Sequence, residues 1–182
     1  MTISNSKKNV SHSRGFALLI AVVVSSIILA IGLSIMTITL KQLQFSITSR
    51  DSEVAFYAAD AGMECALYWD YSSNGGKFDF GGGSKNISCM GSSITTNPVT
   101  SGSIQTINFQ VGWGASPAVC ADVTVKKYFD PSTSVTIDAS TGDMCPRGVT
   151  CTRTVSKGYN VNCAIVAAPT LRTVERSLRA SF

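Results

Sequence analysis

Residues 16–40 read FALLIAVVVSSIILAIGLSIMTITL, a run that contains no formally charged side chain. A helix of this length rises roughly 37 Å, and the hydrocarbon layer of a bilayer is about 30 Å thick, so the run is long enough to span it. Lys7, Lys8 and Arg14 precede the run, and no acidic residue accompanies them. By the positive-inside rule, we predict a single-pass membrane helix with its N-terminus inside the cell and its C-terminus outside.

The junction before this run places a basic, small-residue stretch ahead of the apolar segment. A secretory signal peptide is cut after its apolar region and loses that region. A cut between Gly15 and Phe16 would instead leave a mature chain that begins with Phe16 and keeps its apolar helix. This order resembles that of a prepilin, and it predicts a leader over residues 1–15.

The helical pattern continues beyond the apolar run. Apolar side chains between residues 43 and 68 recur at spacings that mostly keep to one helix face, and Gly62 is the only strong local penalty to helix formation. We therefore predict one helix from about Phe16 to about Asp70, about 80 Å long. Its first half, 16–40, is apolar on all sides, and its second half, 41–71, is amphipathic and suited to packing against a globular head.

A block after the membrane segment resembles PilX-type minor pilins of the type IV pilin family. It comprises residues 51–64, DSEVAFYAADAGME, together with ALYW at 66–69, and with the leader junction the resemblance covers roughly residues 14–70. It implies cleavage after Gly15 by a prepilin peptidase and methylation of the new amino terminus of Phe16. It also implies other pilin subunits, an assembly ATPase and a platform in the inner membrane as partners. The assembly helix would then be stored in the membrane and later buried in a fibre, and it carries Phe16, Leu19, Ile20 and Val23.

One position departs from the pattern of the major pilins. The fifth residue of the predicted mature chain is Ile20, where major pilins usually carry a glutamate. In the family that carboxylate is thought to pair with the amino terminus of a neighbouring subunit, an attraction that low-dielectric surroundings strengthen. Ile20 cannot form this pair. Minor pilins and pseudopilins at a fibre tip can lack the glutamate, so Ile20 favours a tip or priming role over a bulk role.

Beyond Tyr71 the composition shifts to glycine, serine, threonine and asparagine, which predicts a head over residues 72–182. In the last predicted strand Val174, Leu178, Ala180 and Phe182 alternate with polar residues, so we expect one largely buried face that Arg176 interrupts. The predicted fold class is α+β, a long N-terminal helix packed on a small antiparallel sheet. Strands are predicted at 103–113, 119–129, 134–139, 151–159 and 172–182.

All six cysteines lie beyond the apolar segment, and an even number in an exported domain predicts disulfides. Fifteen pairings are possible in principle. No two cysteines have C-x-x-C spacing and no histidine accompanies them, so we predict no metal site. The pairing that we favour is Cys65 with Cys89, Cys120 with Cys163, and Cys145 with Cys151.

The sequence argues against an enzyme. The only histidine, His12, lies in the predicted leader, so the mature chain lacks the Ser-His-Asp and Cys-His arrangements of nucleophilic catalysis. We predict no catalytic residue and no cofactor. Residues 138–143, DASTGD, could offer oxygen ligands to calcium, but they lack the full EF-hand spacing, and a polar turn is the favoured interpretation.

The charge balance gives no generic affinity for nucleic acid. The chain carries 15 basic and 11 acidic residues, a net charge of +4, and removal of the leader reduces the basic count to 12 and the net charge to +1. A local patch beside Tyr128 and Tyr159 could still contact DNA or another surface ligand. Cross-strand charge pairs, including one with Glu175, are the preferred interpretation. The basic residues concerned are Lys126, Lys127, Arg147, Arg153, Lys157, Arg172, Arg176 and Arg179.

Together these patterns predict a structural minor pilin at or near the tip of a type IV pilus, serving assembly priming, adhesion, motility or DNA uptake. Before assembly it would sit in the cell membrane, and afterwards in the extracellular fibre. One alternative is a pseudopilin of a type II secretion system, which the same N-terminus also fits. The other is an extracellular adhesin or receptor that stays anchored by its helix, and retention of residues 1–15 would favour it.

Overall fold

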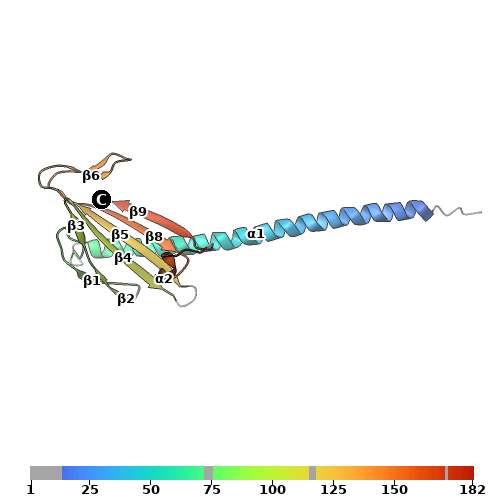
Figure 1. The fold of residues 1–182 in the computed structure, drawn as a ribbon, viewed down its shortest axis with the longest axis horizontal. Helices are drawn as coiled ribbons and strands as arrows, with labels where there is room; N and C mark the ends of the chain where they lie inside the picture. The colour runs from blue at the N-terminus through green and yellow to red at the C-terminus, as the bar shows by residue number, and fades with distance from the viewer. Residues whose placement is uncertain (1–13, 72–75, 115–117, 171) are drawn as a thin grey trace, which may run out of the picture. The chain divides into compact units, whose positions relative to one another are not determined.

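The computed structural model describes residues 14–71, 76–114, 118–170 and 172–182. The chain divides into two compact units, Met1–Ile47 and Thr48–Phe182. The helix α1 (Arg14–Asp70) contributes to both units, and the strands and the short helix α2 (Cys163–Val166) belong to the second (Figure 1). These elements establish the predicted α+β class, with a long N-terminal helix and an antiparallel sheet.

In the first unit, α1 exposes its large apolar side chains from Phe16 to Ile47. Among the described residues, this helix is the one long and apolar enough to cross a membrane, judged by length and composition. The structure therefore agrees with the predicted membrane-spanning segment. The helix persists because the run contains no proline and only one glycine, Gly32.

The second unit is built on an antiparallel sheet of five strands in the order β3-β4-β5-β8-β9. Two small hairpins, β1-β2 and β6-β7, accompany it. The predicted strands correspond to β4, β5, β6, β8 and β9. The strand bounds are β1 Lys85–Cys89, β2 Ser92–Thr96, β3 Val99–Ser101, β4 Ile104–Trp113, β5 Val119–Tyr128, β6 Val135–Asp138, β7 Asp143–Cys145, β8 Cys151–Tyr159 and β9 Glu175–Ser181.

The sequence reading missed the hairpin of β1 and β2. Cys89 pairs with Ser92, so only Met90 and Gly91 connect the strands, and their φ angles are 49° and 78°. Two positive φ values are typical of the two-residue hairpin turn whose twist matches that of the flanking strands. Gly91 is therefore the residue in the sequence that indicates this turn.

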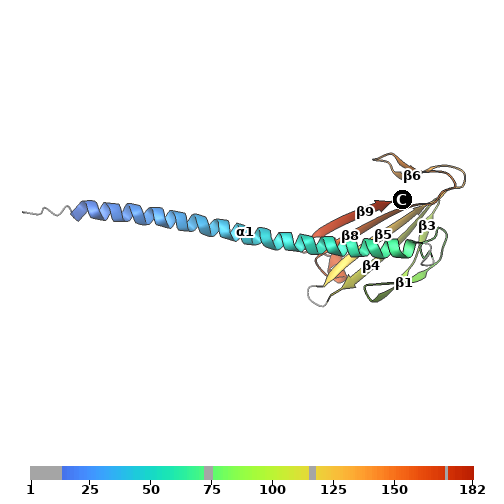
Figure 2. The ribbon, with the colours of Figure 1, turned by 180° about the vertical axis from the view of Figure 1, so that it is seen from behind.

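From Thr48 onward, α1 lies across one face of the five-stranded sheet (Figure 2). The contact is made by small residues on both sides. Ala55, Ala58, Ala59 and Ala66 of α1 are buried, and a Cβ placed on Gly158 of β8 would lie 2.0 Å from the carbonyl oxygen of Ala55. The backbones of the helix and of β8 therefore approach each other directly.

Gly62, which the sequence identified only as a helix penalty, has a packing role. A Cβ at this position would lie 2.6 Å from Ser156 Oγ and 2.7 Å from Ala121 Cβ, which belong to β8 and β5. A glycine in a helix interior costs about 1 kcal/mol relative to alanine. The absence of a side chain allows the close approach, so the local penalty is offset by tertiary packing.

The apolar core lies between α1, β4, β5 and the β1-β2 hairpin. Phe78 stacks on Phe109 with ring centroids 5.9 Å apart. The structure contains three disulfides, which are the pairs favoured from the sequence: Cys65–Cys89, Cys120–Cys163 and Cys145–Cys151. The first joins α1 to β1 beside this core.

The last strand shows the predicted alternation, but its apolar face is incompletely covered. Val174, Leu178 and Ala180 are partly buried, the polar residues that alternate with them along β9 are exposed, and Phe182 is 61% exposed. β9 is an edge strand, and α1 crosses the sheet over β5 and β8, so its cover does not extend fully to the edge. Arg176 lies on this same face, where its Nε donates a hydrogen bond of 2.7 Å to Ser52 Oγ of α1.

Candidate functional site

The predicted processing junction lies at the start of α1. The helix begins at Arg14, so the backbone of Gly15 and Phe16 is helical, whereas residues 1–13 of the predicted leader lie outside the described residues. Cleavage between Gly15 and Phe16, and methylation of Phe16, stay predictions.

The four residues assigned to the assembly helix, Phe16, Leu19, Ile20 and Val23, are all exposed in the single chain. The same is true of the large apolar residues that follow them as far as Ile47. An apolar surface of this extent is not stable in water and indicates contact with lipid or with other proteins. The segment can thus serve as a membrane anchor or as a helix that packs among other helices.

Four hydroxyl groups within the apolar run are paired inside the helix. Those of Ser25, Ser26, Thr37 and Thr39 donate to backbone carbonyl oxygens three or four residues earlier, at 2.8–3.0 Å. A polar group without a partner is costly in hydrocarbon, and this local bonding removes that cost. A helix always brings a carbonyl oxygen three or four residues earlier within reach of a serine or threonine hydroxyl, so this pairing follows from the predicted helix.

A buried ion pair joins the end of α1 to the sheet. Lys127 Nζ contacts Asp70 Oδ1 and donates a hydrogen bond of 2.7 Å to Thr152 Oγ1. The side chains of Lys127 and Asp70 are only 9% and 6% exposed. A carboxylate in the last turn of a helix is disfavoured by the helix dipole, so the Lys127 ammonium stabilises Asp70 where it lies.

The placement of Lys127 separates it from the other basic residues with which the sequence analysis grouped it. Alternation along β5 turns Lys127 toward α1 and Lys126 toward the opposite face. Arg176 also lies on the α1 face. Arg147 and Arg172 lie outside the strands. The eight residues therefore do not form one surface.

On the face opposite α1, the remaining cations are mostly paired with carboxylates. Arg153 lies 2.9 Å and Arg179 3.3 Å from Asp138 Oδ2, and Lys157 lies 3.2 Å from Glu175 Oε1. Lys157 and Glu175 belong to the neighbouring strands β8 and β9, as expected for a cross-strand charge pair. The geometry supports the interpretation as a charge-paired strand face, on which Lys157 and Glu175 form a solvent-exposed pair.

On or beside this face, hydrogen bonds lower the pKa of two carboxyl groups, and burial raises the pKa of one phenol. The hydroxyl and backbone N–H of Ser140 donate to Asp138, and with Arg153 they lower the pKa of its carboxyl group to about 2. The Tyr159 hydroxyl donates at 2.8 Å to Glu175 and lowers the pKa of that carboxyl group. Burial, reinforced by Glu175, raises the pKa of Tyr159. Each pKa shift is thus explained by hydrogen bonds to neighbouring groups or by burial.

The segment 138–143 forms a turn in which the amide of Gly142 donates to the carbonyl oxygen of Asp138 at 2.9 Å. The Asp138 carboxylate is engaged by Ser140, Arg153 and Arg179, which is the arrangement of a polar turn. Within the described ranges, no group of three His, Cys, Asp or Glu residues is placed to hold a metal ion.

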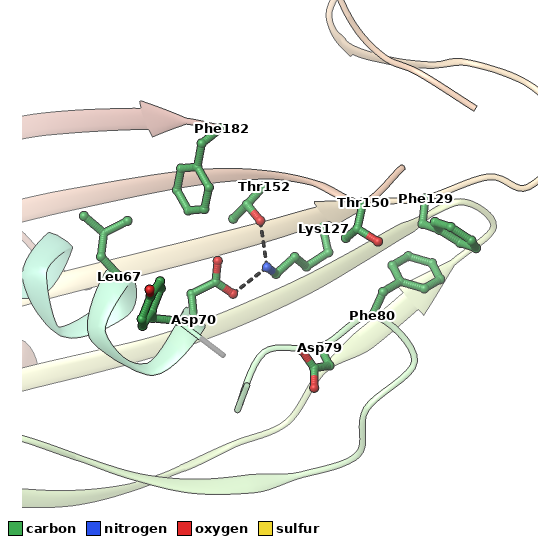
Figure 3. Close-up of a pocket in the computed structure, with 10 residues that line it drawn as sticks. Leu67, Asp70, Asp79, Phe80, Lys127, Phe129, Thr150, Thr152 and Phe182 are labelled. Carbon is green, nitrogen blue, oxygen red and sulfur yellow. Dashed lines mark hydrogen bonds and ion pairs between the residues drawn. The ribbon is translucent and has the colours of Figure 1, made fainter. Parts of the chain in front are cut away.

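A hollow of about 820 Å³ opens in the head beside the C-terminal end of α1 (Figure 3). The buried Lys127–Asp70 pair forms part of its lining. No local pattern in the sequence predicts this hollow, because its residues come from five separate parts of the chain. They are Leu67, Asp70, Tyr71, Asp79, Phe80, Lys127, Phe129, Thr150, Thr152 and Phe182.

The chain matches no protein-family model, no curated protein and no solved structure. Its architecture, a long apolar N-terminal helix packed on an antiparallel sheet, is pilin-like.

Proposed function

We propose that this protein is a non-enzymatic minor pilin of the PilX type and a structural subunit of a type IV pilus. The observation that best supports the proposal is that α1 has two different surfaces along its length. One helix contains an exposed apolar segment and a second segment whose alanines and Gly62 pack on the sheet of the head. A subunit stored in a membrane and later packed in a fibre requires these two surfaces on the same helix.

In this proposal the leader stays in the cytoplasm and a prepilin peptidase cuts after Gly15. The new terminus at Phe16 is methylated, and the pilus assembly platform extracts the helix into an extracellular fibre of other pilin subunits. Ile20 supports a position at or near the tip, because it cannot pair with the amino terminus of a neighbouring subunit. There the head would serve assembly priming, adhesion, motility or DNA uptake.

The amino terminus of the mature protein tests the proposal. We would purify the chain from membrane fractions and from sheared fibres of its native cells, and determine its intact mass and terminal peptide. We expect a chain that starts at Phe16, with the mass of one added methyl group, in the fibre fraction.

Two valine substitutions make the test specific. Gly15→Val enlarges the residue at the junction and is expected to leave residues 1–15 attached and to remove the protein from fibres. Gly32→Val makes the same chemical change inside the apolar run, where a Cβ would meet no atom within 4 Å. It should be processed normally, to a chain that starts at Phe16.

The alternatives give different results. A chain that starts at Met1 and stays in the membrane would overturn the proposal and favour the permanently anchored adhesin or receptor. A chain that starts at Phe16 but is absent from fibres, and whose deletion blocks protein secretion, would instead assign it to a type II secretion system.

A further inference from the structure

The hollow beside the C-terminal end of α1 has the size of a small-molecule site. Its volume of about 820 Å³ falls within the range of roughly 300–1,000 Å³ that is typical of ligand pockets. It lies wholly in the second unit, whereas the predicted assembly half of α1, residues 16–40, belongs to the first. No residue of that half lines the hollow.

The walls of the hollow are apolar and largely aromatic. Phe80 and Phe129 lie together with ring centroids 5.6 Å apart. Figure 3 shows them on one side of the Lys127 ammonium, with Leu67 and Phe182 on the other side. Tyr71 also lines the hollow and is 66% exposed. These side chains offer flat apolar surfaces that solvent reaches.

Between these walls lies a polar floor whose charges are balanced. The ammonium of Lys127 contacts the carboxylate of Asp70 and donates to Thr152 Oγ1. An ammonium has three donors, a carboxylate has several acceptor sites, and a hydroxyl that accepts a bond can also donate one. The floor therefore presents both donors and acceptors while the charges of the pair cancel.

This combination selects a class of ligand. Because the charges of Lys127 and Asp70 cancel, the floor offers no net attraction to an organic cation or to an organic anion. A ring sugar matches both parts of the hollow, because its hydroxyl groups are donors and acceptors and its C–H face can pack on an aromatic ring. We propose that the hollow binds a carbohydrate ring, with its hydroxyl groups toward Lys127, Asp70 and Thr152 and its apolar face toward the aromatic walls.

Saturation-transfer NMR on the full chain tests this proposal. The protein would be held in micelles of a detergent without a sugar head group. The probes are the methyl glycosides of glucose, galactose, mannose and N-acetylglucosamine at about 10 mM, tenfold above a Kd of 1 mM. Sorbitol serves as a comparison, since it has hydroxyl groups but no rigid apolar face. We expect transfer to at least one glycoside and weaker transfer to sorbitol.

Exposed tyrosines supply a matched pair of variants. Tyr71→Ser removes a wall of the hollow and should weaken glycoside binding by up to about tenfold, the upper range for an aromatic contact. Tyr68→Ser makes the same change in the last turn of α1, three residues before Tyr71, at a side chain that is 56% exposed and does not line the hollow. Its affinity should stay within about twofold of the unmodified protein. Both residues are exposed, so neither change should prevent folding.

The proposal would be overturned by no transfer to any of the glycosides, by equal transfer to sorbitol, or by equal loss of binding in the two tyrosine variants. Transfer to choline or to an uncharged capped tripeptide in place of the glycosides would assign the hollow to a different chemistry and also reject it. The processing of Gly15 is measured separately, so failure here would leave the proposed pilin function unaffected.

Discussion

Replacing Gly158 by alanine is expected to destabilise the head more than its small change in volume suggests. Gly158 does not have a positive φ, so its backbone conformation accepts an alanine. The obstacle is the helix. The added Cβ would lie 2.0 Å from the Ala55 carbonyl oxygen, 2.2 Å from the Ala59 nitrogen and 2.9 Å from the Ala58 carbonyl carbon.

The size of the effect follows from these distances. Non-bonded heavy atoms prefer separations of about 3.5 Å or more, so the helix and β8 must move apart by about 1.5 Å. Overpacking in a well-packed core typically costs about 1–3 kcal/mol. The atoms contacted at Gly158 are backbone atoms of a helix, which cannot rotate away as a side chain can. We therefore expect a loss of about 3 kcal/mol.

Urea unfolding measures this loss. Trp69 and Trp113 both pack against the core of the head, so their fluorescence reports its unfolding. With a slope of about 1.5 kcal/mol per molar urea, a loss of 3 kcal/mol lowers the midpoint by about 2 M. The full chain would be measured in detergent micelles under oxidising conditions.

Gly112→Ala is the matched control. It lies in β4 of the same sheet, and its Cβ would meet Cys163 Sγ at 3.2 Å and the Val119 carbonyl oxygen at 3.6 Å. These neighbours require a shift of only a few tenths of an ångström, so the loss should stay below about 1 kcal/mol. Equal midpoints for Gly158→Ala and Gly112→Ala would refute the argument that the backbones of α1 and β8 are in direct contact.

Three further predictions concern the ion pair, the disulfides and an acid. Lys127→Ala leaves the buried Asp70 carboxylate without its cation and should cost about 3–5 kcal/mol in urea unfolding, whereas Lys127→Met combined with Asp70→Leu should restore most of that loss. Serine replacement of Cys120 and Cys163, which are 43 residues apart, should cost about 4 kcal/mol, against about 2 kcal/mol for Cys145 and Cys151, which are 6 apart; equal urea midpoints would contradict the chain-entropy argument. Ionised Asp138 should stabilise the head at every pH above 3.8, the ordinary pKa of its carboxyl group. This stabilisation should be lost as the pH falls through about 2, the pKa of that group in the folded protein. The Tm of Asp138→Asn should therefore lie below that of the unmodified protein at pH 6 and approach it near pH 2, and a gap that stays constant would be the contrary result.

Much of the fold was readable from local patterns. The uncharged run 16–40 and the helical periodicity after it predict α1, and strand-forming runs bounded by turn residues predict β4, β5 and β8 close to their observed bounds. Helix and strand periods depend on neighbours in the sequence, so the sequence alone carries them. The two-residue turn at Met90 and Gly91 carried a local signal as well, which was overlooked.

The tertiary structure decided what lies between these elements. Strand pairing determined that Lys127 faces α1 and meets Asp70, while Lys126 lies on the other face. The crossing of α1 over β5 and β8 explains Gly62 and Gly158, and it leaves Phe182 of the edge exposed beside the hollow. These features depend on contacts between residues far apart in the chain, whose register no local period specifies. The sequence by itself therefore determined the helix, the principal strands and a cysteine-paired head, and only packing decided which side chains were brought together.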